Sequence, residues 1–280
     1  MHSDLSARSE YASKSQPYFG ATVGRVANRI KNGKFSIGNQ QFNTTKNRGN
    51  NTLHGGADGF NFVSTSSSLS IRTWQYHLDG KKVTFSYLSK DGEEGFPGDV
   101  LASVTYELAP GNQLSITMKA TSTKQTPINM CNHSYFNLAG HKSGATEVYK
   151  HTVKINAFGF TKTDSESIPT VLMDSTWRSA AKFPVEHPTS GIAMEVHADQ
   201  PGVQFYTGNG LSNATVGKGS TPYSKHGAFC LETQNYPDAV NHVKEVFGNQ
   251  INLCRDRGLN PRLPAQKSDT LPIDHQVTHF

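Results

Sequence analysis

The chain has 280 residues, which is enough for one large domain with a substantial core. Its 27 Lys and Arg residues against 22 Asp and Glu residues give a net charge of +5, but the basic residues are scattered. We find no basic run or basic helical face of the kind that nucleic-acid-binding proteins carry, and no apolar run near the ~20 residues of a membrane-spanning helix. We therefore expect neither a nucleic-acid partner nor a membrane partner.

Cysteine usage and the first residues point to a compartment. Cys131, Cys230 and Cys254 form no CxxC pair and are odd in number, which favours a reducing environment without a disulfide framework. The polar residues 1–18 lack the apolar segment of a secretory signal. We expect a cytoplasmic protein.

The first predicted elements are strands. Residues 1–17 form a polar lead-in, and a strand-like run with two glycines begins at Tyr18. Residues 33–43 alternate in polarity around Gly38 and Asn39, a pattern that predicts a hairpin. Residues 47–59 are rich in Asn and Gly and are predicted to be a loop that leaves His54 at a rim.

A pair of neighbouring strands is the clearest structural prediction. Apolar residues alternate along two runs that are joined by a Pro-Gly-Asn turn at 110–112, and each run places its apolar residues on one face. The two sets are Val100, Ala102, Val104, Tyr106 and Leu108, and then Leu114, Ile116, Met118 and Ala120.

The second half of the chain gives fewer signals. No element is predicted between residues 170 and 201, a short strand is predicted at 202–208, and a strand followed by a loop at 226–241. Residues 243–280 are expected to be a divergent, poorly ordered tail. With no repeat and no long amphipathic helix, we predict an all-β fold, a large antiparallel sandwich formed by one domain over residues 18–242.

Chemically useful side chains gather in segments rich in glycine or aromatic residues. The segment NHSYFNLAG (132–140) combines an imidazole, amides, a hydroxyl and aromatic rings, a composition that suits a sugar site. Five polar positions stand near predicted strand ends: Arg29, His54, His133, Gln204 and Glu232. Because Phe, Cys and Leu precede Glu232, we expect burial to raise its pKa toward the range of a general base.

These residue types permit three functions. The first is general acid–base chemistry on a hydroxylated substrate. The second is a His/His/Glu metal site on a β scaffold, against which stands the lack of HxH or HxxxH pairing by His54 and His133. The third is a sugar-binding module without turnover. Sequence motifs of phosphate and nucleotide binding, and the GxSxG motif of hydrolases, are absent.

Five segments resemble the signature segments of the aldose 1-epimerase family, also called galactose mutarotases. They are FGATVGRVANRI (19–30), LHGG (53–56), NHSYFNLAG (132–140), PGVQFYTG (201–208) and LETQ (231–234), and they follow the family's order. The resemblance implies a β-sandwich of the galactose mutarotase type. It also implies interconversion of the α and β anomers of hexoses such as galactose and glucose, without a cofactor or a metal.

The resemblance also implies roles for individual residues. Glu232 corresponds to the base that takes the proton from the C1 hydroxyl, His133 to the acid that protonates the ring oxygen, and His54 to an assistant at that oxygen. Asn28, Arg29 and Gln204 correspond to residues that hold the sugar hydroxyls. We expect these side chains to converge, with His133 and Glu232 facing each other across a gap wide enough for a pyranose ring.

The chain also departs from the family pattern. Only 17 residues precede Tyr18, only 30 lie between Thr170 and Pro201, and no strand like the family's closing one follows Asn241. An Asp that binds sugar hydroxyls in the family has no counterpart. We therefore expect an incomplete sandwich with reduced stability and weak turnover, the alternative being a carbohydrate-binding or regulatory relative with little or none.

Overall fold

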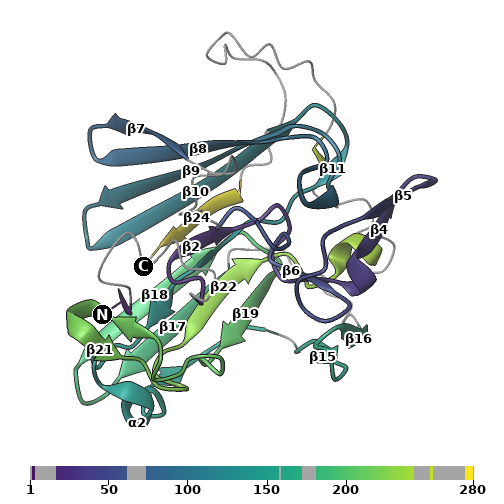
Figure 1. The fold of residues 1–280 in the computed structure, drawn as a ribbon. Coiled ribbons are helices and arrows are strands. Elements are labelled where there is room, and N and C mark those ends of the chain that lie inside the picture. Colours follow the sequence, from purple (N-terminus) through teal and green to yellow (C-terminus); the bar gives the residue numbers. More distant parts are fainter. Residues whose placement is uncertain are drawn as a thin grey trace.

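The computed structural model describes residues 2–3, 17–61, 74–157, 159–171, 181–242, 253–254 and 275–279. Strands dominate these residues, and the one α-helix among them is short, α2 at Gly144–Val148. Figure 1 shows a large curved sheet with shorter strands crossing in front of it. In the described part of the chain, no helix combines the length and hydropathy that crossing a membrane requires.

The large sheet has eight strands in the order β14-β17-β18-β24-β10-β9-β8-β7, and all its pairings are antiparallel. These strands are β7 (Gln75–Asp79), β8 (Lys82–Ser89), β9 (Val100–Ala109), β10 (Gln113–Ser122), β14 (Thr152–Val153), β17 (Ala181–His187), β18 (Ile192–Ala198) and β24 (His275–His279). The sheet forms one layer of the fold.

Short strand pairs supply the rest of the fold. The pairs are β1 (His2–Ser3) with β13 (Tyr135–Phe136), β2 (Ala21–Val23) with β12 (Cys131–His133), β3 (Arg29–Ile30) with β6 (Thr52–Leu53), β4 (Lys34–Ile37) with β5 (Gln40–Asn43), β11 (Thr126–Pro127) with β23 (Leu253–Cys254), β15 (Lys162–Thr163) with β16 (Pro169–Val171), β19 (Gly202–Tyr206) with β22 (Cys230–Gln234), and β20 (Val216–Gly217) with β21 (Thr221–Pro222). Four 3₁₀ helices also occur among the described residues: η1 (Lys31–Gly33), η2 (Glu93–Gly95), η3 (Lys218–Ser220) and η4 (Ala239–Asn241).

The core lies between the large sheet and these short strands. One cluster packs the inner faces of β9 and β10 against Phe60, Ile128 and Met130. A second packs Phe183, Val185 and Val196 of β17 and β18 against a set that includes Phe229 and Leu231. Apolar residues on one face of each layer thus meet, and the predicted all-β sandwich is confirmed.

Two predicted strand pairs are confirmed. The hairpin β4–β5 turns at Gly38 and Asn39, and β9 and β10 pair along their whole length from Ala109–Gln113 to Val100–Ser122. Leu108 differs from the other residues of its predicted face: it is 66% exposed and lies close to the turn at 110–112.

The sequence did not predict the hairpin of β17 and β18. Phe183, Val185 and His187 are buried in the alternation of a strand, but Pro184 lies among them and donates no backbone hydrogen bond. Within the predicted tail, β23 and β24 pair with earlier strands, and the other residues of 243–280 lie outside the described residues. The lead-in is described only at β1 and at Pro17.

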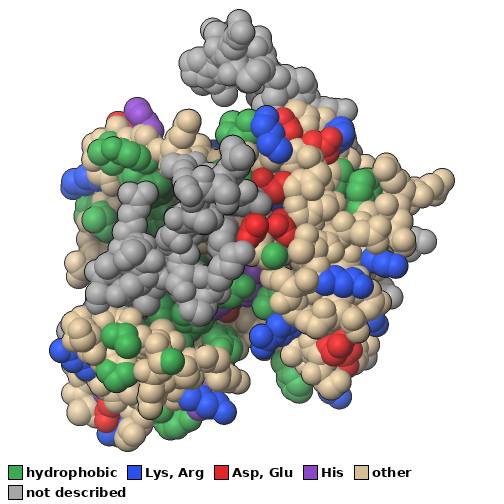
Figure 2. Space-filling model, in the orientation of Figure 1, with side chains coloured by type: hydrophobic (Ala, Val, Ile, Leu, Met, Phe, Trp, Pro, Cys, Tyr) green, Lys and Arg blue, Asp and Glu red, His purple; other side chains and the backbone are tan. Residues whose placement is uncertain are grey.

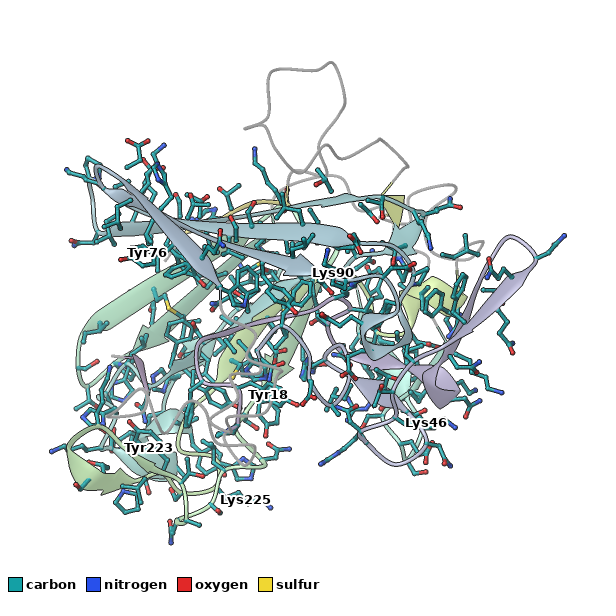
Figure 3. The ribbon with its side chains drawn as sticks, turned by 45° about the horizontal axis from the view of Figure 1, so that its top comes forward. Tyr18, Lys46, Tyr76, Lys90, Tyr223 and Lys225 are labelled. Carbon is teal, nitrogen blue, oxygen red and sulfur yellow. The ribbon has the colours of Figure 1, made fainter. Side chains whose placement is uncertain are left out.

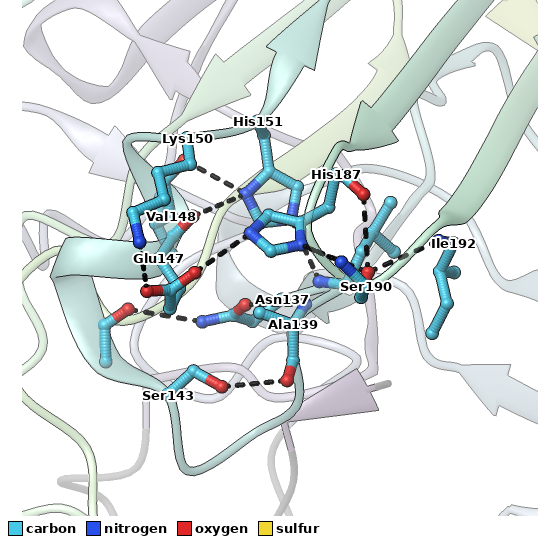
Figure 4. A network of polar contacts seen from close by, with 12 residues as sticks. Asn137, Ala139, Ser143, Glu147, Val148, Lys150, His151, His187, Ser190 and Ile192 are labelled. Atoms are coloured by element: carbon cyan, nitrogen blue, oxygen red, sulfur yellow. Dashed lines mark hydrogen bonds and ion pairs between the residues drawn. The ribbon is translucent and has the colours of Figure 1, made fainter.

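A buried polar network anchors residues 132–140 (Figure 4). The side-chain amide of Asn137 donates to the carbonyl oxygens of Gly227 at 3.1 Å and Gly144 at 3.3 Å. The Leu138 amide donates to Nε2 of His151 at 2.9 Å. These bonds tie the end of the segment to α2 and to the chain just before β22. They thereby fix the position of His133, which lies four residues before Asn137.

Candidate active site

Glu232 lies in the middle of β22, whose five residues are all buried. Its cross-strand partner on β19 is Gln204. Because residues directly opposite each other in an antiparallel pair point to the same face, the carboxyl and the amide share one face of this two-stranded sheet. The exposed fraction of Glu232 is only 2%.

His133 ends β12 and lies next to Glu232. The backbones of Phe136 and Phe229 exchange hydrogen bonds of 2.8 and 3.0 Å, which bring the chain after β12 beside the chain before β22. Nε2 of His133 is 3.5 Å from Oε1 of Glu232. The predicted gap wide enough for a pyranose ring is therefore wrong, because side chains on adjacent chain segments meet directly.

His54 follows β6 in a left-handed conformation, with a φ of 52°. Its backbone amide donates to the carbonyl of Asn28 at 2.9 Å, and the Asn28 amide donates to Nδ1 of His54 at 3.2 Å. A Cβ at Gly55 would lie 1.8 Å from the Gly24 carbonyl oxygen, so only glycine fits after this histidine. The Glu94 carboxylate accepts from the amides of Ala57 and Asp58 and holds the loop that follows.

The predicted sugar-holding residues line up beside this cluster. Asn28 donates its side-chain amide to Oε1 of Gln204 at 3.0 Å. Arg29 pairs with Leu53 across β3 and β6 and so lies next to His54 in the fold. Nε of Arg29 is buried and has no hydrogen-bond partner among the described residues. A buried donor without a partner costs stability, and a ligand oxygen would satisfy it.

The predicted residues thus come together. One ligand atom from each of His54, His133 and Glu232 lies within 4.8 Å of the others, and all three residues are buried. The Tyr18 ring lies 4.9 Å from the His54 ring and 5.7 Å from the His133 ring. Figure 2 shows histidine side chains in the hollow at the centre of this face, and Figure 3 places Tyr18 in the middle of the molecule.

Burial sets the protonation of the cluster. It raises the pKa of Glu232 to about 8, with the positive charge of Arg29 opposing the rise. It lowers the pKa of His133 to about 4. Burial, together with His133 and Arg29, also holds the pKa of His54 well below its usual value. At neutral pH the two imidazoles are therefore uncharged, and the expected rise in the pKa of Glu232 is confirmed.

The three residues do not fit a metal ion. A histidine that binds a metal through one nitrogen donates a proton from the other. Nδ1 of His54 instead accepts the Asn28 amide proton, so the ring proton of the neutral imidazole is on Nε2. The lone pair of Nδ1 is thus taken by the Asn28 amide, and Nε2 carries a proton, so neither nitrogen of His54 has a lone pair for a cation.

Two cysteines and Tyr206 at the site were not predicted, whereas Tyr135 belongs to the segment 132–140 whose rings were predicted to suit a sugar. Cys131 and Cys230 are buried beside Glu232 and His133, and the rings of Tyr135 and Tyr206 lie 5.0 and 6.3 Å from that of His133. The signal was present: each cysteine precedes a predicted catalytic residue by two positions on a strand, where side chains share a face. The stretch 172–180, in the region where the family carries its sugar-binding Asp, lies outside the described residues.

Comparisons with known proteins bear on this arrangement. A family model described as aldose 1-epimerase matches residues 4–186 and 175–251. The galactose mutarotase of Rattus norvegicus is 40% identical over an alignment covering 81% of this chain and 73% of that protein. The aldose 1-epimerase of Escherichia coli strain K12 is 31% identical over 80% of this chain and 73% of that protein.

Solved structures share the fold. An aldose epimerase homologue from C. elegans superposes with a TM-score of 0.79 at 22% identity, over 99% of this chain and 86% of that one. A galactose 1-epimerase from Lactobacillus acidophilus superposes with a TM-score of 0.70 at 19% identity, over 98% of this chain and 82% of that one. The relatives' sandwich is therefore the architecture of this chain as well.

Proposed function

The chain belongs to the aldose 1-epimerase family, and from this premise we propose that it interconverts the α and β anomers of hexoses at the cluster of His54, His133 and Glu232. By relationship and fold it is an enzyme of the isomerase class. The observation that carries the proposal is the buried contact between a carboxyl and an imidazole at 3.5 Å.

The reaction needs two proton transfers, one at each of the two oxygens bonded to C1. Opening the hemiacetal ring removes the proton from O1 and delivers a proton to O5, while the C1–O5 bond breaks and C1=O1 forms. Rotation about C1–C2 and closure, with both transfers reversed, give the other anomer. Because O1 and O5 are bonded to the same carbon, a base and an acid in direct contact suit the reaction, and no ring-sized gap between them is needed.

We assign the base to Glu232 and the acid to His133. At neutral pH the pair holds one proton, which rests on Glu232 because burial raises the pKa of the carboxyl and lowers that of the imidazole. Transfer across the 3.5 Å contact produces the carboxylate–imidazolium form, which accepts from O1 and donates to O5. Ring closure restores the same single proton, so no other reactant is consumed.

The remaining residues hold the sugar in this proposal. His54 lies beside His133 and Glu232 as a neutral donor, and its Nε2–H can donate to the ring oxygen. Arg29 offers its unpartnered Nε–H to a sugar oxygen. The paired side-chain amides of Asn28 and Gln204 are proposed to bind the sugar hydroxyls. Galactose and glucose are the proposed substrates, with a role in hexose metabolism.

A polarimetric assay tests the function. Freshly dissolved α-galactose and α-glucose should reach anomeric equilibrium faster with the purified protein. Glu232→Gln and His133→Asn should lower kcat by ~10²–10⁴-fold and leave sugar binding largely intact, because each removes one proton-transfer group. A sugar-dependent rise in melting temperature without any rate would instead support the carbohydrate-binding alternative.

We also propose a reduced rate and a cytoplasmic location. The sequence has no counterpart of the family's sugar-binding Asp, and a hydrogen bond to a charged group contributes roughly 1.5–3 kcal/mol, so affinity should fall about tenfold or more. A side-by-side assay with the Rattus norvegicus enzyme measures this difference. The free thiols of Cys131 and Cys230 suit a reducing compartment, which localisation of a tagged protein would test.

A further inference from the structure

Asp238, in the chain that follows β22, binds the backbone on both sides of Ile30. The Asp238 amide donates to the carbonyl oxygen of Arg29 at 2.9 Å, and Oδ1 of Asp238 accepts from the amide of Lys31 at 2.8 Å. Ile30 between them is extended, with a φ of −119° and a ψ of 117°. Asp238 therefore holds β3 as a partner strand would, in addition to β6.

The Asp238 side chain is itself held in place. It is only 2% exposed, and its Oδ1 also accepts from the side-chain amide of Asn241 at 2.7 Å. Its Oδ2 lies 3.3 Å from Nε2 of His242. Val240, two residues further along, packs in the same buried cluster as Ile30. Asp238 is thus a fixed point of attachment for the backbone that it binds.

The same stretch of chain carries the proposed base. Glu232 precedes Asp238 by six positions. Between them, the amide of Asn235 donates to Oδ1 of the buried Asn129 at 2.9 Å. Because the stretch is short and anchored, the bonds of Asp238 join the strand that carries Glu232 to the strand that carries Arg29.

The guanidinium of Arg29 has few contacts of its own. Its Nε is buried without a hydrogen-bond partner among the described residues, and its Nη1 donates to Oδ1 of Asn28 at 3.5 Å, beyond the usual length of such a bond. The positive charge nonetheless reaches Glu232, because it opposes the rise in the pKa of that carboxyl. A long side chain with such weak contacts stays near Glu232 only if its backbone is held there.

We propose that Asp238 is a positioning residue: by binding the backbone of Arg29 and Lys31, it keeps the Arg29 guanidinium beside Glu232. Asp238 touches no substrate and acts through Arg29, which holds the sugar and lies close enough to the base to influence its charge. This proposal rests on the proposed epimerase function.

The proposal differs in sign from a direct effect of the Asp238 charge. A negative charge raises the pKa of a nearby carboxyl, so its removal would lower the pKa of Glu232. Displacement of Arg29 takes a positive charge away from Glu232, so the pKa would rise above its value of about 8. A purely structural Asp238 would affect stability and leave this pKa unchanged.

Carbon NMR of the full-length protein, labelled with ¹³C in the carboxyl groups of glutamate, measures the pKa of Glu232 without sugar. The Glu232 signal is identified by its loss in Glu232→Gln. Asp238→Gly removes the carboxyl without strain, because glycine readily adopts the φ of 57° found there, and it should raise the pKa. Asp238→Asn keeps an acceptor at Oδ1 and tolerates the same φ, so the pKa should stay near 8.

A second variant tests the contact from its other side. Lys31→Pro removes the amide that Asp238 binds, at the first residue of η1, where proline is tolerated after an extended residue. It should raise the pKa of Glu232 as Asp238→Gly does, so either variant carries the test if the other does not fold. The variants leave unchanged the other titratable groups around Glu232, which are His54, Cys131, His133, Tyr135, Tyr206 and Cys230.

The matched control is Asp91→Gly. Asp91 lies between β8 and β9, and its carboxylate likewise accepts a backbone amide, that of Gly98. The control variant should lower the melting temperature and leave the pKa of Glu232 unchanged. A shift caused by general loosening of the fold would instead appear in this variant as well.

Kinetics show whether the effect passes through Arg29. Asp238→Gly should raise KM for galactose roughly threefold to tenfold, the size of one lost hydrogen bond, with kcat at neutral pH largely unchanged. Asp238→Asn should recover most of the loss. In the background of Arg29→Met, Asp238→Gly should change neither KM nor the pKa of Glu232, because the group that it positions is absent.

Three results would overturn the proposal. They are a Glu232 pKa that stays unchanged in folded Asp238→Gly or Lys31→Pro, a pKa that falls in both Asp238→Gly and Asp238→Asn, and an undiminished effect of Asp238→Gly in the background of Arg29→Met. Because the NMR measurement needs no turnover, the two claims fail separately. Absence of mutarotation with a raised pKa would remove the proposed function and leave the positioning role, whereas mutarotation with an unchanged pKa would do the opposite.

Discussion

Nε2 of His133 and Oε1 of Glu232 lie 3.5 Å apart, and their side chains are only 5% and 3% exposed. An exposed pair of this kind would be a carboxylate and a partly charged imidazole at neutral pH. Burial disfavours both charges, so the pair shares a single proton. Because the groups interact, the two macroscopic pKa values belong to the pair.

The pH dependence of turnover should follow from this count. Below about 4 both groups are protonated and no base remains, and above about 8 the shared proton is lost and no acid remains. We expect a bell-shaped profile of kcat/KM with limbs near these values, measured by polarimetry from about pH 3 to about pH 10. A limb near the ordinary histidine value of about 6.5 would contradict it.

Glu232→Gln should make the folded protein more stable at high pH. An exposed glutamate in the unfolded chain has a pKa of about 4.5, and burial raises that of Glu232 to about 8 in the fold. Between these values the folded state holds a proton that the unfolded state has released, so the stability of the unmodified protein falls as pH rises through the window. The advantage of the variant in urea unfolding should grow from about pH 5 and level off above about 8. An advantage that shrinks with rising pH would refute the burial argument.

His54→Gln should slow the reaction without moving its pH limbs. His54 is neutral across the working range because burial, His133 and Arg29 hold its pKa well below the usual value. A Gln amide can supply a donor in place of Nε2–H, so we expect a loss of roughly tenfold or less, and a larger loss in His54→Ala. If His54 were the acid instead of His133, the acidic limb would disappear in His54→Gln.

Arg29 should affect both binding and the alkaline limb, and two variants separate these effects. Arg29→Lys keeps the positive charge and loses the Nε donor, so KM should rise about tenfold while the limb stays in place. Arg29→Met loses the charge that lowers the pKa of Glu232, so the limb should also move to higher pH. Equal limbs in the two variants would show that the charge of Arg29 does not reach Glu232.

Gly55→Ala should unfold the loop that carries His54. Its Cβ would lie 1.8 Å from the Gly24 carbonyl oxygen, at a φ of 87° that disfavours any side chain. We expect a loss of at least ~3 kcal/mol of unfolding free energy. Gly38→Ala is the matched control, because that glycine also has a positive φ but no atom within 4 Å of a Cβ. It should cost only about 1 kcal/mol. Similar losses in denaturant unfolding of the two variants would contradict the prediction.

Local patterns in the sequence were sufficient to predict strands that pair with a neighbouring strand along the chain. The alternation around Gly38 and Asn39 and along residues 100–120 predicted β4–β5 and β9–β10, because a hairpin is formed by neighbouring residues. The hairpin of β17 and β18 was not predicted, because Pro184 argues against a strand and because distant residues of the core stabilise this strand. The resemblance to a family selected residues that the fold brings together, although it did not predict their spacing.

The chemical state of the site depends on contacts that only the folded chain makes. Cys131 reaches Glu232 over a sequence separation of 101 residues, Cys230 reaches His133 over 97, and the backbone of Asn28 sets the tautomer of His54. The sequence indicated the titratable groups of the candidate site, Glu232, His54 and His133. Which of them carries the proton depends on desolvation and on the donors around it, and these arise only when strands far apart in the sequence pack together.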